Sequence, residues 1–515
     1  MPTMENTRVI TRSQLIYGLC LSLAVLLGYL LAEPYESSKM GVVVLLLSVL
    51  VTPLIMRWHH PLLVFSWNAV LAFSFLPGRP PVWLFLTAVG FVFVLLNRCV
   101  NPHARLLIGG SVPKALLWIA LVVAVTALAT GGAGIRVMGS DTFGGKRYIF
   151  LMASIMGYFV LTGNRVPPSR AMIYTGLFFL SGLSGILSSV ANLGGGKFDV
   201  LYYFLTRDYV PVNDSTVAEY DSSGMFRVMG ITQACGAVCL FMLARWGVRG
   251  IFDLAKPWRL GLTVLFFGAG LLGGSRSFVG FLGLIFAIVF FLEGLYRSRS
   301  MLTILLVGLI GGMCLLSFST RLPKSVQRSL SFLPIEISPA AKLDAQVSMD
   351  WRLEMWKTLI PEIPRHLILG KGYVLQPGDL YMANMNAALG MGGTADVSAF
   401  AGDYHNGPLS VLLPFGIWGA LAFGWFLIAA GRVLYLNCAY GDPELKTINQ
   451  ALFACFLGRT VFFFFLVGGL DTDLPYMIGL IGLGVSLNGE TRDWARDPEL
   501  EPVADLVALE EGEGA

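Results

Sequence analysis

Apolar runs close to twenty residues long recur from one end of this chain to the other. A helix of about 20 apolar residues can cross the hydrocarbon core of a bilayer, and helices satisfy all their backbone polar groups internally, as lipid requires. Only 13% of the 515 residues are charged, against about a quarter in soluble domains. The sequence therefore predicts an all-α polytopic membrane protein, and its small net charge of +4 gives no reason to expect a nucleic-acid partner.

The apolar runs predict fourteen spans, several of them short, so we expect about 12–14 transmembrane helices. The first run continues to Ala32 without a clear small-residue cleavage site, which favours an uncleaved span over a signal peptide. The expected spans are 13–32, 41–56, 61–76, 81–96, 112–130, 147–163, 171–193, 228–244, 260–274, 277–295, 301–319, 408–434, 447–469 and 474–488.

The loops between these spans indicate the orientation of the chain. With the N-terminus inside, the inner segments carry about twice as many Lys and Arg residues as the shorter outer loops, as the positive-inside rule requires. The organisation expected from this is a cytoplasmic tail 1–12, a bundle of eleven spans 13–319, an outer loop with a surface helix 320–404, three further spans 405–488 and an acidic cytoplasmic tail 489–515.

The long outer loop contains the segment "SMDWRLEMWKTLIPEIPRHLILGKGY", which predicts a helix. Ser348 or Asp350 can cap its start, and Pro361 ends it. Two tryptophans beside basic residues are typical of a helix lying at the bilayer surface, although a cover helix packed on the bundle fits equally well. The predicted apolar stripe consists of Met349, Leu353, Trp356 and Ile360.

Two arginines in the outer segments are candidates for binding an anion. Arg276 lies in "LLGGSRSFVGFLGLI", a tight turn between two spans, where an arginine is costly unless it is paired or binds something anionic. Its planar guanidinium suits phosphate oxygens, two bonds at a time. Arg352 lies on the predicted surface helix. The simpler alternatives are an interfacial anchor for Arg276 and a solvated surface residue for Arg352.

His405 is one of only five histidines, and it stands where the polar segment "GDYHN" meets a long apolar run. A neutral imidazole can accept a proton from a hydroxyl. Asn406 offers a helix cap beside it, and Gly416 with Gly419 would let a neighbouring helix approach closely and fix the histidine. The alternative is an ordinary interfacial histidine with small-residue packing.

Arg459 lies in the middle of the thirteenth predicted span and is a further candidate, because an intramembrane arginine is often functional. Asp471 or Asp473 can instead pair with it in a structural role. The seven cysteines form no CxxC pattern, and Cys235 and Cys239 on one helix face lack further ligands. The sequence therefore predicts no metal site.

Three stretches taken together resemble the O-antigen ligase and Wzy-type polymerase family of bacterial envelope glycosyltransferases. They are "GGSRS" with Arg276, "WRLEMWK" with Arg352 followed by "ILGKG", and "HN" with His405, nine residues before "GIWG". The resemblance covers the chain from about Leu271 to Leu434. All three candidate side chains fall on the same predicted side of the membrane.

The resemblance implies a GT-C-like, all-helical glycosyltransferase in the bacterial inner membrane, with its active site facing the periplasm. Such an enzyme takes a glycan from an undecaprenyl-diphosphate carrier and passes it to an acceptor hydroxyl, with no metal or other cofactor. By this resemblance Arg276 and Arg352 would bind the donor diphosphate and His405 would be the catalytic base. The acceptor stays open among lipid A–core, a growing glycan and a protein.

Two other classes of protein remain as alternatives. A polysaccharide transporter, or a flippase for lipid-linked oligosaccharides, would line a path with charged residues inside several spans, whereas Arg459 is the single basic residue placed mid-span. No internal repeat is apparent, which disfavours transporter folds built from inverted halves. A structural scaffold for envelope assembly would need none of the three candidate side chains.

Overall fold

The computed structural model describes residues 57–131, 144–193, 228–374 and 402–489, with gaps at 75, 77–78, 101–106, 108 and 299, together with a few isolated positions elsewhere. The predicted tail 1–12, the spans 13–32 and 41–56 and nearly all of the acidic tail lie outside the described residues. The chain divides into two compact units, residues 1–59 and residues 60–515, and all of the helices named in the next paragraphs belong to the second unit.

Apolar helices occupy most of this unit, and their ends lie within a few residues of most predicted spans. Within the described ranges, seven helical stretches are long and apolar enough to cross a membrane, and two shorter apolar helices accompany them. The protein is thus an all-α polytopic membrane protein. The apolar helices are α3 (Val82–Val100), α4 (Val112–Thr130), α5 (Gly145–Leu161), α6 (Pro168–Leu180), α7 (Ser184–Leu193), α8 (Met229–Ile251), α9 (Trp258–Gly270), α10 (Arg276–Leu292), α11 (Ser300–Phe318), α17 (Gly407–Tyr440), α18 (Lys446–Phe465) and α19 (Leu470–Asn488).

The third predicted span, 61–76, is not one helix. The helix that covers 60–66 ends there, and Leu71 forms an isolated antiparallel bridge with Leu205. Polar groups explain the early end: the Asn68 amide donates to the Phe178 carbonyl at 3.0 Å, and Ser184 accepts from a backbone N–H of the same stretch. A mean hydropathy over 61–76 cannot register these individual hydrogen bonds.

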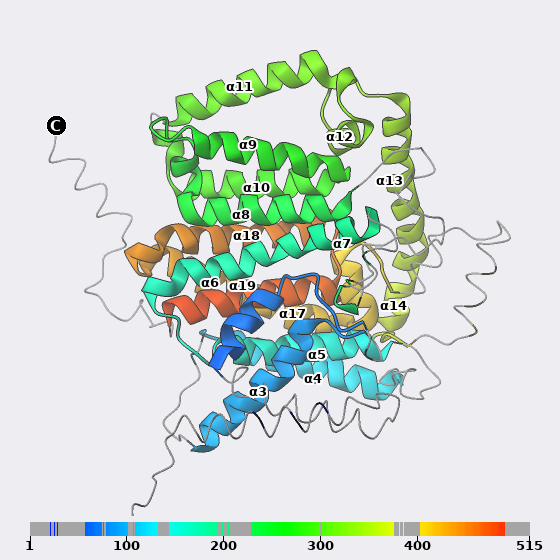
Figure 1. Ribbon diagram of the computed structural model, residues 1–515. Helices are drawn as coiled ribbons and strands as arrows, with labels where there is room; N and C mark the ends of the chain where they lie inside the picture. Colours follow the sequence, from blue (N-terminus) through cyan, green and yellow to red (C-terminus); the bar gives the residue numbers. More distant parts are fainter. Residues whose placement is uncertain are drawn as a thin grey trace, which may run out of the picture. The chain divides into compact units, whose positions relative to one another are not determined.

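Helices far apart in the sequence form the packed core of the unit (Figure 1). Helix α8 packs on α9, α10 and α18, while α17 packs on α4, α18 and α19. Large aromatic side chains such as Phe415, Phe426 and Phe456 are almost fully buried between them. In contrast, α11 has no fully buried residue, and Ile304 and Leu315 are only partly buried against the core.

The helix predicted within segment 320–404 exists but begins earlier than predicted. Helix α13 spans Pro339–Leu359, and its N-cap is Ser338, whose hydroxyl accepts from the Ala341 N–H. The predicted caps Ser348 and Asp350 are therefore wrong, because a serine followed by proline starts the helix about three turns upstream. Its end, just before Pro361, agrees with the prediction.

The predicted apolar stripe of α13 is mostly exposed on the protein surface, and Trp356 is its one member that packs on the described core beside His405. Met349, Leu353 and Ile360 are 45%, 43% and 54% exposed. The buried face of the helix carries small residues at its start and larger ones at its end, and this face contacts the rest of the protein together with Trp356. In Figure 1, α13 crosses the ends of the bundle helices. The buried residues are Ala341, Ala345, Met355 and Leu359.

Candidate active site

Arg276 is the first residue of α10 and follows a turn with a left-handed glycine. Gly274 has φ 68°, a backbone conformation that favours glycine, and Ser275 is the N-cap residue. The carbonyl of Gly274 accepts a hydrogen bond from the Arg328 guanidinium, and the Ser329 hydroxyl donates to the Leu271 carbonyl at 3.0 Å. Short helix α12 (Lys324–Ser329) thus fixes the turn that presents Arg276.

Arg328 connects this turn to α13. Besides the Gly274 carbonyl, its guanidinium binds the carboxylate of Asp344, which lies on α13 two turns before Arg352. The elements that carry Arg276 and Arg352 therefore share one cross-link. Nothing in the sequence pattern singled out Arg328, because its role depends on a carbonyl more than fifty residues away.

Arg352 is partly buried and lies within electrostatic reach of two other guanidinium groups. Burial lowers its pKa, Arg276 and Arg328 lower it further, and Asp403 acts in the opposite direction. Its Nε is buried and has no hydrogen-bond partner among the described residues. An incompletely satisfied arginine beside two others has the chemistry to bind an anion.

A small core docks α13 against the start of α17. The Trp356 indole N–H donates to the Tyr404 carbonyl at 2.9 Å, and the ring of Trp351 lies 5.2 Å from that of His405, centroid to centroid. This core holds His405 near Arg352, which the sequence placed 53 positions earlier. Its buried members are Met355, Leu359, Tyr404, Leu409 and Leu413.

His405 has a backbone conformation that is uncommon for a residue with a side chain. Its φ is 45°, in the left-handed region, which costs on the order of 1 kcal/mol and persists only where the surroundings enforce it. Asn406 is the N-cap of α17, as the sequence predicted, and its side chain accepts from the Leu409 N–H at 3.0 Å. The strained residue is thus held between the small core of α13 and a capped helix.

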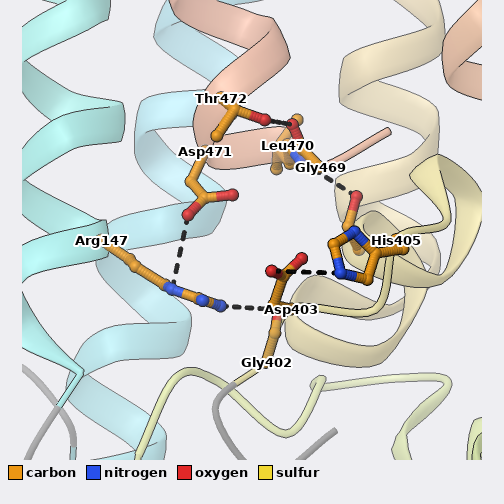
Figure 2. Close-up of polar contacts among 9 residues, drawn as sticks. Arg147, Gly402, Asp403, His405, Gly469, Leu470, Asp471 and Thr472 are labelled. Carbon is orange, nitrogen blue, oxygen red and sulfur yellow. Dashed lines mark hydrogen bonds and ion pairs between the residues drawn. The ribbon is translucent and has the colours of Figure 1, made fainter. Parts of the chain in front are cut away.

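The imidazole of His405 is partly buried beside a carboxylate. Its Nε2 lies 3.5 Å from the Asp403 Oδ2 (Figure 2). Burial lowers the pKa of His405 most, Asp403 raises it, and Arg352 lowers it again. The net pKa is below the ordinary histidine value, so the imidazole is neutral at neutral pH and able to accept a proton.

Helix α17 is broken shortly after His405, and the "LILGKG" segment fills the break. Gly416 has φ 62° and ψ −158°, so the regular hydrogen bonds stop there. The prediction that Gly416 and Gly419 admit a neighbouring helix is wrong: non-helical residues 367–372 approach Gly416, and Gly419 faces Phe415 of its own helix. Three backbone hydrogen bonds close the break, from Lys371 to Leu413, from Gly372 to Pro414 and from Ile417 to Leu367.

Arg147 and Asp471 form a second polar group near His405 that the sequence reasoning missed. The Arg147 Nε lies 3.4 Å from the Asp471 Oδ2, and its Nη1 donates to the Gly402 carbonyl at 2.6 Å (Figure 2). The start of α19 is held here because the Leu470 N–H donates to the Ser410 hydroxyl in the first turn of α17. Arg147, like Arg276, lies at the end of a predicted span, where an arginine is costly unless it is paired or binds an anion. The sequence argument made for Arg276 could therefore have identified Arg147 as well.

Arg459 is paired with Asp473, the arrangement that the sequence left open as its structural alternative. The Asp473 side chain is fully buried and also accepts from the Gly469 N–H at 2.8 Å. A buried carboxylate with these partners stabilises the connection between α18 and α19. This pairing favours a structural role for Arg459.

An apolar cavity of about 350 Å³ opens beside this end of the bundle, between α3 and α5. It is bordered by Tyr148, whose hydroxyl accepts from the Tyr373 N–H at 2.8 Å. Tyr373 in turn lies under the Arg147 guanidinium, 5.4 Å from ring centroid to the central carbon. Apolar and charged surfaces therefore meet at the same end of the bundle.

The structure brings the three principal sequence candidates, Arg276, Arg352 and His405, to one end of the bundle. A family model described as O-antigen ligase matches residues 261–424, from α9 to the middle of α17, and all three candidates lie inside the match. No curated protein matches the chain significantly. The match covers about a third of the chain and supports the predicted resemblance to the O-antigen ligase/Wzy family.

Proposed function

We propose that this protein is a glycosyltransferase that moves a glycan from an undecaprenyl-diphosphate carrier to an acceptor hydroxyl at the outer face of the bacterial inner membrane. The observation that carries the proposal is the convergence of Arg276, Arg352 and His405. The two arginines act on one another electrostatically, and Arg352 acts on His405. The start of α10, the outer segment 320–404 and the spans 405–488 would together form the site.

The arginines would bind the diphosphate of the donor. Arg276 and Arg328 both act electrostatically on Arg352, and Asp403 acts on it in the opposite direction. A bound diphosphate would place negative charge beside these guanidinium groups and give the Arg352 Nε an acceptor. As the bond to the carrier breaks, negative charge grows on the leaving diphosphate, and fixed guanidinium groups stabilise it. In this reaction the arginines supply the positive charge that a metal ion supplies elsewhere.

His405 would act as the general base. Because Asp403 faces Nε2, the other ring nitrogen, Nδ1, is the one that accepts the proton of the acceptor hydroxyl. The acceptor oxygen forms a bond to the anomeric carbon of the glycan, the bond from that carbon to the diphosphate oxygen breaks, and the carrier leaves as its diphosphate. The hydroxyl proton ends on His405.

The test separates binding from transfer in purified protein supplied with a lipid-linked glycan donor. Arg276→Ala should lose donor binding and transfer together, and Arg276→Lys should recover only part of both, because an ammonium cannot form two parallel bonds. His405→Ala should keep donor binding and lose transfer. Full transfer in Arg276→Ala, at normal protein levels, would remove that arginine from the site and contradict the proposal.

The acceptor can be identified from the glycans of a strain that lacks the protein. Long carrier-linked chains beside an unmodified acceptor would identify a ligase. An acceptor that carries a single repeat unit would identify a polymerase, and a missing protein modification would identify a protein glycosyltransferase.

A further inference from the structure

A second cavity, which is polar, lies at the end of α8, α10 and α18 that is opposite the candidate active site. Its volume is about 840 Å³. Helix α10 separates the two places, because Arg276 is its first residue and Leu292, its last, lines the cavity. Seventeen residues of helix span about 25 Å, so a ligand in this cavity cannot touch Arg276. The polar side chains of the lining are Arg249, Asp253, Glu293, Ser300, Thr303, Lys446, Thr447 and Gln450.

The acidic side chains of this cavity are already committed to the backbone. Glu293 accepts from the N–H groups of Val248 at 3.0 Å and of Arg249 at 2.7 Å, one with each carboxylate oxygen. Asp253 accepts from the Ala255 N–H at 3.0 Å. These hydrogen bonds close a break in α8 and a loop, so both carboxylates have structural partners.

The basic side chains of the cavity are not committed in this way. Within the described part of the chain, neither the Arg249 guanidinium nor the Lys446 ammonium forms a hydrogen bond or an ion pair with another side chain, although both act electrostatically on Glu293. The positive field is increased by Arg245 and Arg259, whose guanidinium carbons lie 6.0 and 5.0 Å from the Trp246 ring centroid at the cavity wall. The two lining cations are therefore available to a ligand.

The remaining lining groups suit a phosphate. Three hydroxyls, from Ser300, Thr303 and Thr447, can donate to its oxygens. The first residues of α11 and α18 both lie on the lining, so the positive ends of these helix dipoles add to the effect of the two cations.

We propose that this cavity is a second ligand site, distinct from the candidate active site, that binds the phosphate of a phosphomonoester or phosphodiester through Arg249 and Lys446. The phosphate can belong to the headgroup of an anionic phospholipid, since the cavity lies at the end of membrane-crossing helices, or to a soluble compound. The proposal is independent of the transfer reaction, because no lining residue belongs to the candidate active site.

The experiment measures stabilisation of the full-length protein by two probes. In detergent, its melting temperature is followed while inorganic phosphate is titrated, and in nanodiscs it is compared between phosphatidylglycerol and phosphatidylcholine. Stabilisation by phosphate would identify a soluble ligand, and stabilisation by phosphatidylglycerol alone would identify a lipid headgroup. The double variant Arg249→Gln/Lys446→Gln should weaken the apparent affinity about tenfold or more, since hydrogen bonds to charged groups are lost.

The matched control is the double variant Lys256→Gln/Arg297→Gln, which removes the same charge from exposed residues at this end that do not line the cavity. It should respond to both probes like the unmodified protein. Each single cavity variant keeps one cation and should show an intermediate affinity, so a folding defect of the double variant would not hide the effect. Glycan transfer should persist in all of them. No response to either probe, or an equal loss in the control, would overturn the proposal.

Discussion

Two helices of this protein are broken at a glycine of nearly the same conformation, yet the breaks are closed in different ways. Gly247 in α8 has φ 63° and ψ −177°, and Gly416 in α17 has φ 62° and ψ −158°. In α8 one carboxylate, that of Glu293, accepts the backbone N–H groups that the break exposes. In α17 the backbone of residues 367–372 makes the replacement hydrogen bonds.

The difference determines what each break can control. A side-chain cap satisfies two N–H groups and fixes little else. A backbone cap ties a whole segment to the helix: residues 367–372 follow α13, which carries Arg352, and α17 follows directly after His405. The α17 break therefore fixes the position of the two residues relative to each other, whereas the α8 break only completes the wall of a cavity.

The largest expected effect tests whether His405, which lies just before α17, is the general base of glycan transfer. His405→Gln keeps a side chain of similar size but cannot take up the proton, so transfer should fall on the order of 10²–10⁴-fold while donor binding persists. His366→Gln, in the short helix α14 (Ile363–His366), is the matched control and should keep its activity. Turnover is compared at saturating donor. Substantial transfer by His405→Gln would exclude the general-base role.

The next effect compares the two breaks directly. Alanine at either glycine must adopt a left-handed backbone, which costs on the order of 1–2 kcal/mol. At Gly416 the added Cβ would also lie 2.5 Å from the Leu367 carbonyl oxygen, which is backbone, whereas at Gly247 it would meet the Glu293 carboxylate, a side chain that can move. Gly416→Ala should therefore destabilise the protein by about 3 kcal/mol or more, and Gly247→Ala by less.

Unfolding free energies and transfer rates of both variants decide this comparison. Gly416→Ala should reduce transfer as well as stability, and Gly247→Ala should reduce stability alone. Gly424→Ala is the control within α17, because its added Cβ would meet nothing within 4 Å, and alanine favours a regular helix. Equal effects of Gly416→Ala and Gly247→Ala on transfer would mean that the α17 break does not position the site.

The smallest expected effect concerns pH. Transfer should fall as His405 becomes protonated, and because burial lowers the pKa of His405, this acid limb should lie below the ordinary histidine pKa of about 6.5. Asp403 raises that pKa, so Asp403→Asn should move the acid limb to lower pH, with less than about tenfold change in rate at pH 7 because Asp403 is half exposed.

The rate of transfer measured against pH for Asp403→Asn checks this expectation. Asp350→Asn, an exposed position on α13, is the control and should leave the profile unchanged. An acid limb that stays in place in Asp403→Asn would show that the carboxylate does not act on the catalytic base.

The sequence alone predicted the class of fold and most helix ends, because a membrane span depends on the local run of apolar residues. Helix α4 covers 112–130, as expected from its hydropathy. The family resemblance was also readable from short stretches around Arg276, Arg352 and His405, and the match to residues 261–424 supports it. The roles of those residues remain proposals.

Tertiary structure decided the features that depend on partners distant in the sequence. The apolar stretch 61–76 turns because Asn68 and Ser184 offer hydrogen bonds there. Helix α13 buries two alanines, Ala341 and Ala345, while Met349 and Leu353 of its apolar stripe stay exposed. Hydropathy cannot distinguish a face that contacts protein from one that contacts lipid, because both are apolar.

For the charged residues too, the sequence located the side chains and the tertiary structure chose their partners. The sequence located Arg459 in a span, but only packing chose Asp473 as its partner, and only packing joined Arg147 to Asp471. Gly416 was noticed in a small-residue pattern, yet its function is to admit the backbone of 367–372. A pattern of residue types determines which groups a segment can offer. Which groups meet is decided by the fold, because a hydrogen bond or ion pair forms only where both partners are brought within reach.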